Sequence, residues 1–180
     1  MGEIKSSIEI ALERAAAMGE GDGEELARSE GAKKGGAMAR RLLNGDMDMQ
    51  GFAAGLAEMQ GPGLAAARVA AGEVLLAGMP GNPQASLLGV KALADSAGAP
   101  QAAEDVLAAA EAVRSASLGL EARLAEGLAL QLRRAGISGS AVLPNPRAHP
   151  DYEELVQSDL GEVSGRLADA GQALLESLGG

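Results

Sequence analysis

The stretch DYEELVQSDLGEVSGRLADAGQALLESL, residues 151–178, has the clearest helical pattern in the chain. Its apolar side chains recur every three or four residues, and this spacing places them on one face of an α-helix. The stripe consists of Tyr152, Val156, Leu160, Val163, Leu167, Ala170, Leu174 and Leu178. The first turn is rich in carboxylates, which the helix dipole favours at that end. The pattern therefore predicts one amphipathic helix over the whole stretch.

The same spacing, read outward from this segment, predicts helices along the rest of the chain. The predicted segments are 3–18, 24–43, 46–60, 64–78, 83–97 and 100–135, with a possible bend or split at residues 117–119. We expect the glycines of residues 19–23 to break the first two segments apart, with Asp22 and Glu25 forming a capping box. Asn82 followed by Pro83 predicts a capped helix start. Three prolines within residues 136–150 predict an irregular loop.

Composition and patterning together predict an all-α fold, a compact bundle of six to seven helices in a single domain, residues 1–180. Within it we expect polar N-terminal helices at 1–45, projecting from core helices at 46–135. The proline-rich loop at 136–150 and the C-terminal amphipathic helix at 151–178 complete the chain. Residues 51–100 contain only five charged side chains, so this block should be the most buried. Few β-branched residues occur in runs, so no sheet of three or more strands is expected.

Residues 24–43 are the least regular of the predicted helices. They carry many charged side chains together with Gly31, Gly35 and Gly36. Each glycine inside a helix costs about 1 kcal/mol relative to alanine. We therefore expect this segment to need support from other helices.

Charge and cysteine content exclude several classes of function. The net charge is −10, which disfavours binding to nucleic acid or to anionic membranes. The chain has no cysteine, so disulfides, thiolate metal sites and cysteine nucleophiles are excluded. The beginning of the chain has no signal-peptide pattern, and no stretch is long and apolar enough to span a membrane. The expected location is the cytoplasm of a bacterium-like cell.

A single histidine, His149, limits metal and hydrolytic chemistry further. Di-iron bundles and zinc hydrolases need more than one histidine, and a Ser-His-Asp triad would have to use this one. His149 directly precedes Pro150 and Asp151, so a helix cap or an exposed loop residue is the favoured interpretation. We predict no catalytic residue, no metal site and no cofactor.

One basic cluster could bind an anion. It consists of Lys33, Lys34, Arg40 and Arg41. A solvated face, or pairing with the surplus of acidic side chains, is the favoured interpretation. Lys91 lies in an apolar stretch and could be a buried nucleophile, but Asp95 four residues later favours a surface ion pair.

The opening EIKSSIEIALERAAAM and the later GISGSAVLPNP resemble an uncharacterised family of small helical proteins from anaerobic bacteria. The resemblance covers about a quarter of the chain and implies a helical architecture. It implies no activity and no functional residue.

The leading hypothesis for function is a structural or protein-interaction module that self-associates, forming a homodimer or binding another protein. The C-terminal stripe is about 40 Å long, whereas a domain of this size is about 30 Å wide, so part of the stripe should be exposed. The predicted interface consists of Val156, Leu160, Val163, Leu167 and Leu174.

Two other functions remain open: a small-ligand binder or enzyme that uses carboxylates and arginines in a helical pocket, and an anion-dependent regulator that uses the basic cluster.

We also expect the loop to pack Ile137, Val142 and Leu143 onto the bundle.

Overall fold

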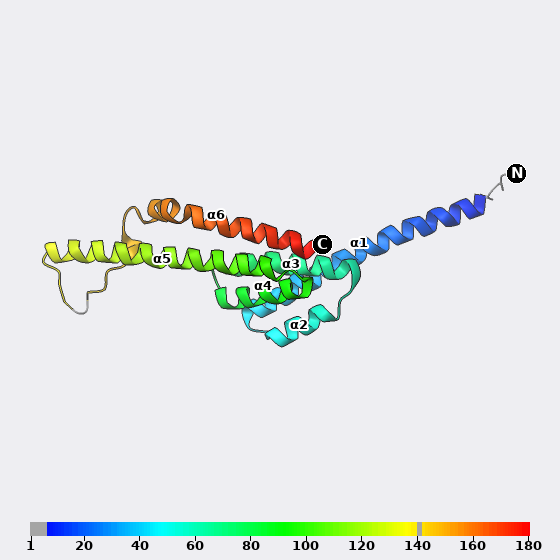
Figure 1. Ribbon diagram of the computed structural model, residues 1–180, viewed down its shortest axis with the longest axis horizontal. Coiled ribbons are helices and arrows are strands. Elements are labelled where there is room, and N and C mark those ends of the chain that lie inside the picture. Colours follow the sequence, from blue (N-terminus) through cyan, green and yellow to red (C-terminus); the bar gives the residue numbers. More distant parts are fainter. Residues whose placement is uncertain (1–6, 140–141) are drawn as a thin grey trace. The chain divides into compact units, whose positions relative to one another are not determined.

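The computed structural model describes the backbone of residues 7–139 and 142–180, and the side chains of these residues from position 23 onward. Six α-helices and one short 3₁₀-helix occur in this part of the chain (Figure 1). They are α1 (Ser7–Asn44), α2 (Met49–Ala57), α3 (Gly61–Gly78), α4 (Pro83–Ala97), α5 (Pro100–Arg134), η1 (Pro146–Ala148) and α6 (Tyr152–Gly179). No strand occurs among the described residues, and the predicted all-α helical bundle is confirmed.

The predicted break at residues 19–23 is wrong, because α1 continues through these glycines without interruption. Glycine keeps its backbone N–H and so can still donate the helical hydrogen bond, whereas proline cannot. No proline occurs in α1. A capping box at Asp22 and Glu25 is therefore also wrong, since both residues lie inside the helix. The predicted side-chain stripe of residues 3–18 lies outside the described side chains.

Most of the other predicted boundaries lie close to those observed. α4 begins at Pro83 and ends at Ala97, as predicted, and the side chain of Asn82 caps it by accepting a hydrogen bond from the Ala85 N–H at 3.2 Å. α5 is one helix, without a split at residues 117–119. α3 begins at Gly61, three residues earlier than predicted, because Pro62 fits the first turn of a helix, where no backbone donor is needed.

The contacts between residues divide the chain into two units. The first unit is Met1–Ala103 with Leu174–Gly180, and the second is Glu104–Ala173. The expectation of a single domain stays a prediction, and so does the projection of residues 1–45.

In the first unit, α1 and α3 pack at very short range. A Cβ at Gly31 would overlap the backbone of Gly63, and a Cβ at Gly35 would overlap the backbone of Ala67. These contacts advance together along both helices, so α1 and α3 run parallel. A Cβ at Gly63 would in turn lie 3.0 Å from the Ala27 carbonyl oxygen. The glycines that weaken α1 as an isolated helix thus form its contact with α3.

Larger side chains surround this contact and complete the core of the first unit. The end of α6 packs on α3, where a Cβ at Gly72 would meet Leu175 and Leu178 at 2.9 and 3.0 Å. The buried apolar side chains of this unit are Met38, Ala39, Leu42, Phe52, Leu56, Ala67, Ala71, Leu75, Met79, Val90, Leu93, Ala94, Ala103, Leu174 and Leu178. Nine of these 15 lie within residues 51–100, so the prediction that this block is the most buried is confirmed.

The second unit is a helical hairpin. Its two arms are the part of α5 from Glu104 onward and the part of α6 up to Ala173. Within this unit α5 and α6 lie side by side and run antiparallel (Figure 1). The guanidinium of Arg123 on α5 donates a hydrogen bond to the carboxylate of Asp159 on α6.

Candidate functional site

The basic cluster on α1 lies on exposed surface. Lys33, Lys34, Arg40 and Arg41 all have exposed side chains. Lys34 lies 3.9 Å from the Glu58 carboxylate, and Arg41 donates to the carbonyl oxygen of Asp46 at 3.4 Å. Two of the four cations therefore already have partners within the chain, and this arrangement favours a solvated face over an anion site.

An open groove of about 690 Å³ lies in the first unit, between α1, α3 and the end of the chain. Its lining is mostly small: Ala32, Gly61, Pro62, Ala65, Ala66, Val69, Ala70, Gly179 and Gly180. Arg28 and Glu73 are its two charged lining residues. Arg28 pairs with Glu24 at 3.3 Å. The groove therefore does not offer the set of convergent polar groups that orients a small ligand or a substrate.

The predicted interface residues of α6 fall into two groups. Val156, Leu160, Val163 and Leu167 are half-buried along the hairpin of the second unit. Leu174 instead lies in the core of the first unit with no exposed surface. The stripe is continuous in sequence, but only its first part is accessible to another molecule.

The matching seam of α5 is also partly open. Val106 and Leu120 are buried, whereas Val113, Leu124 and Leu128 are half-buried. Two arms alone give each apolar stripe one neighbouring helix, and a bundle normally covers such a stripe on more than one side. Each arm therefore leaves apolar surface beside the contact with the other arm.

Charged groups connect the hairpin across its arms and along α5. Besides the bond between Arg123 and Asp159, Arg147 lies 3.9 Å from Glu121. On α5, Arg114 donates to Glu111 at 2.8 and 2.7 Å. This hydrogen bond lowers the pKa of the Glu111 carboxyl, because it stabilises the charged form.

The loop of residues 137–149 does not pack as expected. Leu143 is 87% exposed and Ile137 is 50% exposed, although Val142 is half-buried. An apolar groove of about 370 Å³ lies between the end of α5 and this loop, with Leu128, Leu132 and Leu143 among its lining residues. Leu143 thus lines this groove while most of its own surface stays exposed.

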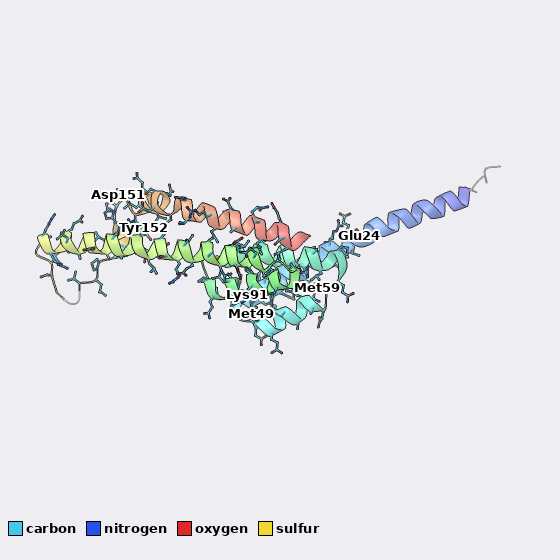
Figure 2. The ribbon with its side chains drawn as sticks, in the orientation of Figure 1. Glu24, Met49, Met59, Lys91, Asp151 and Tyr152 are labelled. Atoms are coloured by element: carbon cyan, nitrogen blue, oxygen red, sulfur yellow. The ribbon has the colours of Figure 1, made fainter. Side chains whose placement is uncertain are left out.

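The remaining candidates have structural roles. His149 accepts a hydrogen bond at Nδ1 from the Asp151 N–H at 3.2 Å, immediately before α6 begins at Tyr152. Figure 2 labels Asp151 and Tyr152 at this start of α6. Lys91 is exposed on α4, so a buried lysine nucleophile is excluded (Figure 2). Among the described residues, no group of three or more His, Cys, Asp or Glu side chains could hold a metal ion.

Within the part of the chain that the structure describes, no helix has the length and apolarity needed to cross a membrane. No family model, no curated protein and no solved structure matches this chain. The resemblance to a family of small helical proteins from anaerobic bacteria therefore stays a prediction.

Proposed function

We propose that this protein is a structural or protein-interaction module that self-associates through the α5–α6 hairpin, acting in the cytoplasm. One observation carries the proposal: the apolar stripes of both arms are only half-buried in the second unit. Half-buried side chains recur along about three turns of α6, from Val156 to Leu167. A continuous apolar surface of this kind usually marks an interface.

A second copy of the chain is the simplest partner for this surface. Pairing two hairpins gives a four-helix bundle, in which each stripe faces the common core. A twofold dimer is also the commonest closed assembly of identical chains. Leu174 is left out of the proposed interface because it lies in the core of the first unit.

The alternative function, a ligand binder or enzyme, has less support. It requires arginines and carboxylates that converge in a pocket, whereas the groove beside Arg28 and Glu73 is open and lined mainly by alanine and glycine. Regulation by an anion has similarly little support, because Lys34 and Arg41 already have partners in the chain.

The test compares two substitutions on the same stripe. Leu167→Glu places a charge on the half-buried part of α6, so it should give a folded monomer. Leu174→Glu places the same charge in the core of the first unit, so it should unfold that unit. Sedimentation gives the mass and circular dichroism gives the helix content. A wild-type chain that sediments as a monomer at tens of micromolar would contradict the proposal.

A further inference from the structure

We infer that two copies of this chain exchange Leu143, so that the Leu143 side chain of each copy lies in the other copy's apolar groove between α5 and the loop. The inference rests on the proposed self-association, and it names the residue that docks and the surface that receives it. It is carried by one projecting leucine beside one apolar groove, both within the second unit.

Leu143 projects from an ordered part of the loop. It has the greatest exposed fraction of the large apolar side chains that the structure describes, at 87%. Pro144 restricts the backbone of Leu143 to extended conformations. The next turn is held by Asn145, whose Oδ1 accepts from the Arg147 N–H at 3.2 Å and whose carbonyl oxygen accepts from the Ala148 N–H at 3.0 Å. A side chain presented by an ordered backbone loses less conformational entropy when it docks.

The groove beside Leu143 is open and suits an apolar side chain. It has a volume of about 370 Å³. Its lining consists of Leu128, Gln131, Leu132 and Ala135 from α5 and of Leu143, Pro144, Asn145 and Ala148 from the loop. No charged side chain is among these described lining residues, so the groove offers no counter-charge to an ionic group.

The groove continues the half-buried seam of α5. Leu124, Leu128 and Leu132 follow one another at intervals of four residues, so they lie on one face of the helix. All three are half-buried, and Leu128 belongs both to the seam and to the groove lining. A second hairpin that covers the seam therefore also reaches the groove.

A second copy of the chain fits the groove because this surface is self-complementary. A twofold interface brings the same surface of both chains together, so that surface must carry both a projection and a hollow that receives it. Leu143 is the projection, and the groove beside it is the hollow. The exchange therefore buries both copies of Leu143 and fills both grooves.

The first experiment removes the projecting side chain. Leu143→Ala should keep the helices of the monomer, because Leu143 is almost fully exposed there. It should self-associate about tenfold more weakly or worse, which is the effect of losing a buried leucine side chain. Leu118→Ala is the matched control, since Leu118 is 53% exposed but does not line the groove. Sedimentation measures the association, and circular dichroism measures the helix content.

The second experiment locates Leu143 by cross-linking. The chain has no cysteine, so each introduced cysteine is the only thiol of its chain. A mixture of Leu143→Cys and Ala135→Cys chains should form the mixed disulfide under mild oxidation, because the exchange places position 143 of one copy beside position 135 of the other. Mass spectrometry identifies this disulfide. A mixture of Leu118→Cys and Ala135→Cys chains is the control and should form much less of it.

The outcomes separate this inference from the proposed function. A wild-type dimer that Leu143→Ala leaves equally strong, or one without the mixed disulfide, would overturn the exchange and leave self-association standing. A small apolar molecule in the groove would also overturn it; native mass spectrometry would show this molecule as an added mass that Ala135→Phe removes. A monomeric wild-type chain would overturn both proposals.

Discussion

Gly35 on α1 lies directly against the backbone of Ala67 on α3, so closely that a Cβ at position 35 would overlap the Ala67 carbonyl oxygen. The same relationship holds one turn earlier, between Gly31 and Gly63. Two backbones can approach this closely only where one of them lacks a side chain. The absence of a side chain therefore sets the distance between α1 and α3.

The first prediction concerns Gly35→Ala. The added methyl group must push α1 away from α3, which should lower the free energy of unfolding by about 2 kcal/mol, as overpacking in a core does. Gly23→Ala is the matched control, because Gly23 lies in the same helix and a Cβ there meets nothing within 4 Å. The control should gain about 0.5–1 kcal/mol from better helix propensity. Thermal unfolding of both variants compares the two effects. Equal changes in the unfolding temperature would contradict the close contact between Gly35 and Ala67.

This contact also shows where prediction from the sequence fails. The bounds of two helices could be predicted closely from local sequence signals. Asn82 and Pro83 mark the start of α4, and the helical spacing of apolar residues in 151–178 marks α6. α1 could not, because Gly31 and Gly35 weaken a helix when considered alone. Their benefit arises only from α3, more than 25 residues further along the chain. Local propensity contains no information about such a partner.

The proposed interface shows a similar limit. The sequence predicts the stripe on α6 correctly, since every third or fourth residue is apolar. It cannot distinguish Leu167 from Leu174, which have the same chemistry and lie on the same face. The difference comes from the end of α6, which packs on α3 and buries Leu174 and Leu178 completely. Exposed Leu143 was likewise unpredictable, because prolines indicate an irregular backbone without indicating its direction.

The second prediction concerns Ser86, the one buried polar side chain among the described residues. Its side chain has no exposed surface, and its Oγ has no hydrogen-bond partner. A buried hydroxyl without a partner destabilises the fold. Ser86→Ala removes this hydroxyl and should raise the free energy of unfolding by about 1 kcal/mol. Denaturant unfolding measures the change, and a less stable variant would show that the hydroxyl has a partner in solution.

The third prediction concerns Arg68, which joins α3 to the end of α4. Its Nε donates to the Ser96 Oγ at 2.9 Å, and its guanidinium also donates to the Ser96 carbonyl oxygen. The last carbonyl groups of a helix have no partner within it, and a cation beside them is favourable. Arg68→Met should therefore lower the free energy of unfolding by about 2 kcal/mol, which is typical for the loss of hydrogen bonds to a charged group.

Arg28→Met provides the control for Arg68. Arg28 forms an exposed pair with Glu24 one turn away in the same helix, and such pairs contribute about 0.5 kcal/mol or less. Chemical denaturation should separate the two variants clearly. If Arg68→Met unfolds at the same denaturant concentration as Arg28→Met, the bonds to Ser96 do not stabilise the contact between α3 and α4.

The last prediction concerns Asn82, whose side chain serves two helices at once. Its Oδ1 accepts from the Ala85 N–H at 3.2 Å and caps α4, while its Nδ2 donates to the Leu43 carbonyl oxygen at 2.9 Å near the end of α1. Asn82→Ala loses both bonds and should lower the free energy of unfolding by about 2 kcal/mol. Asn82→Asp keeps the cap, which the dipole of α4 favours, but its carboxylate cannot donate to Leu43 at neutral pH.

The comparison of the two variants therefore isolates the bond to Leu43. At neutral pH, Asn82→Asp should lie below the wild type in stability, because a carboxylate then faces a carbonyl oxygen. Urea unfolding of both variants at neutral pH measures the two losses of stability. An Asp variant as stable as the wild type would mean that the bond to Leu43 contributes nothing.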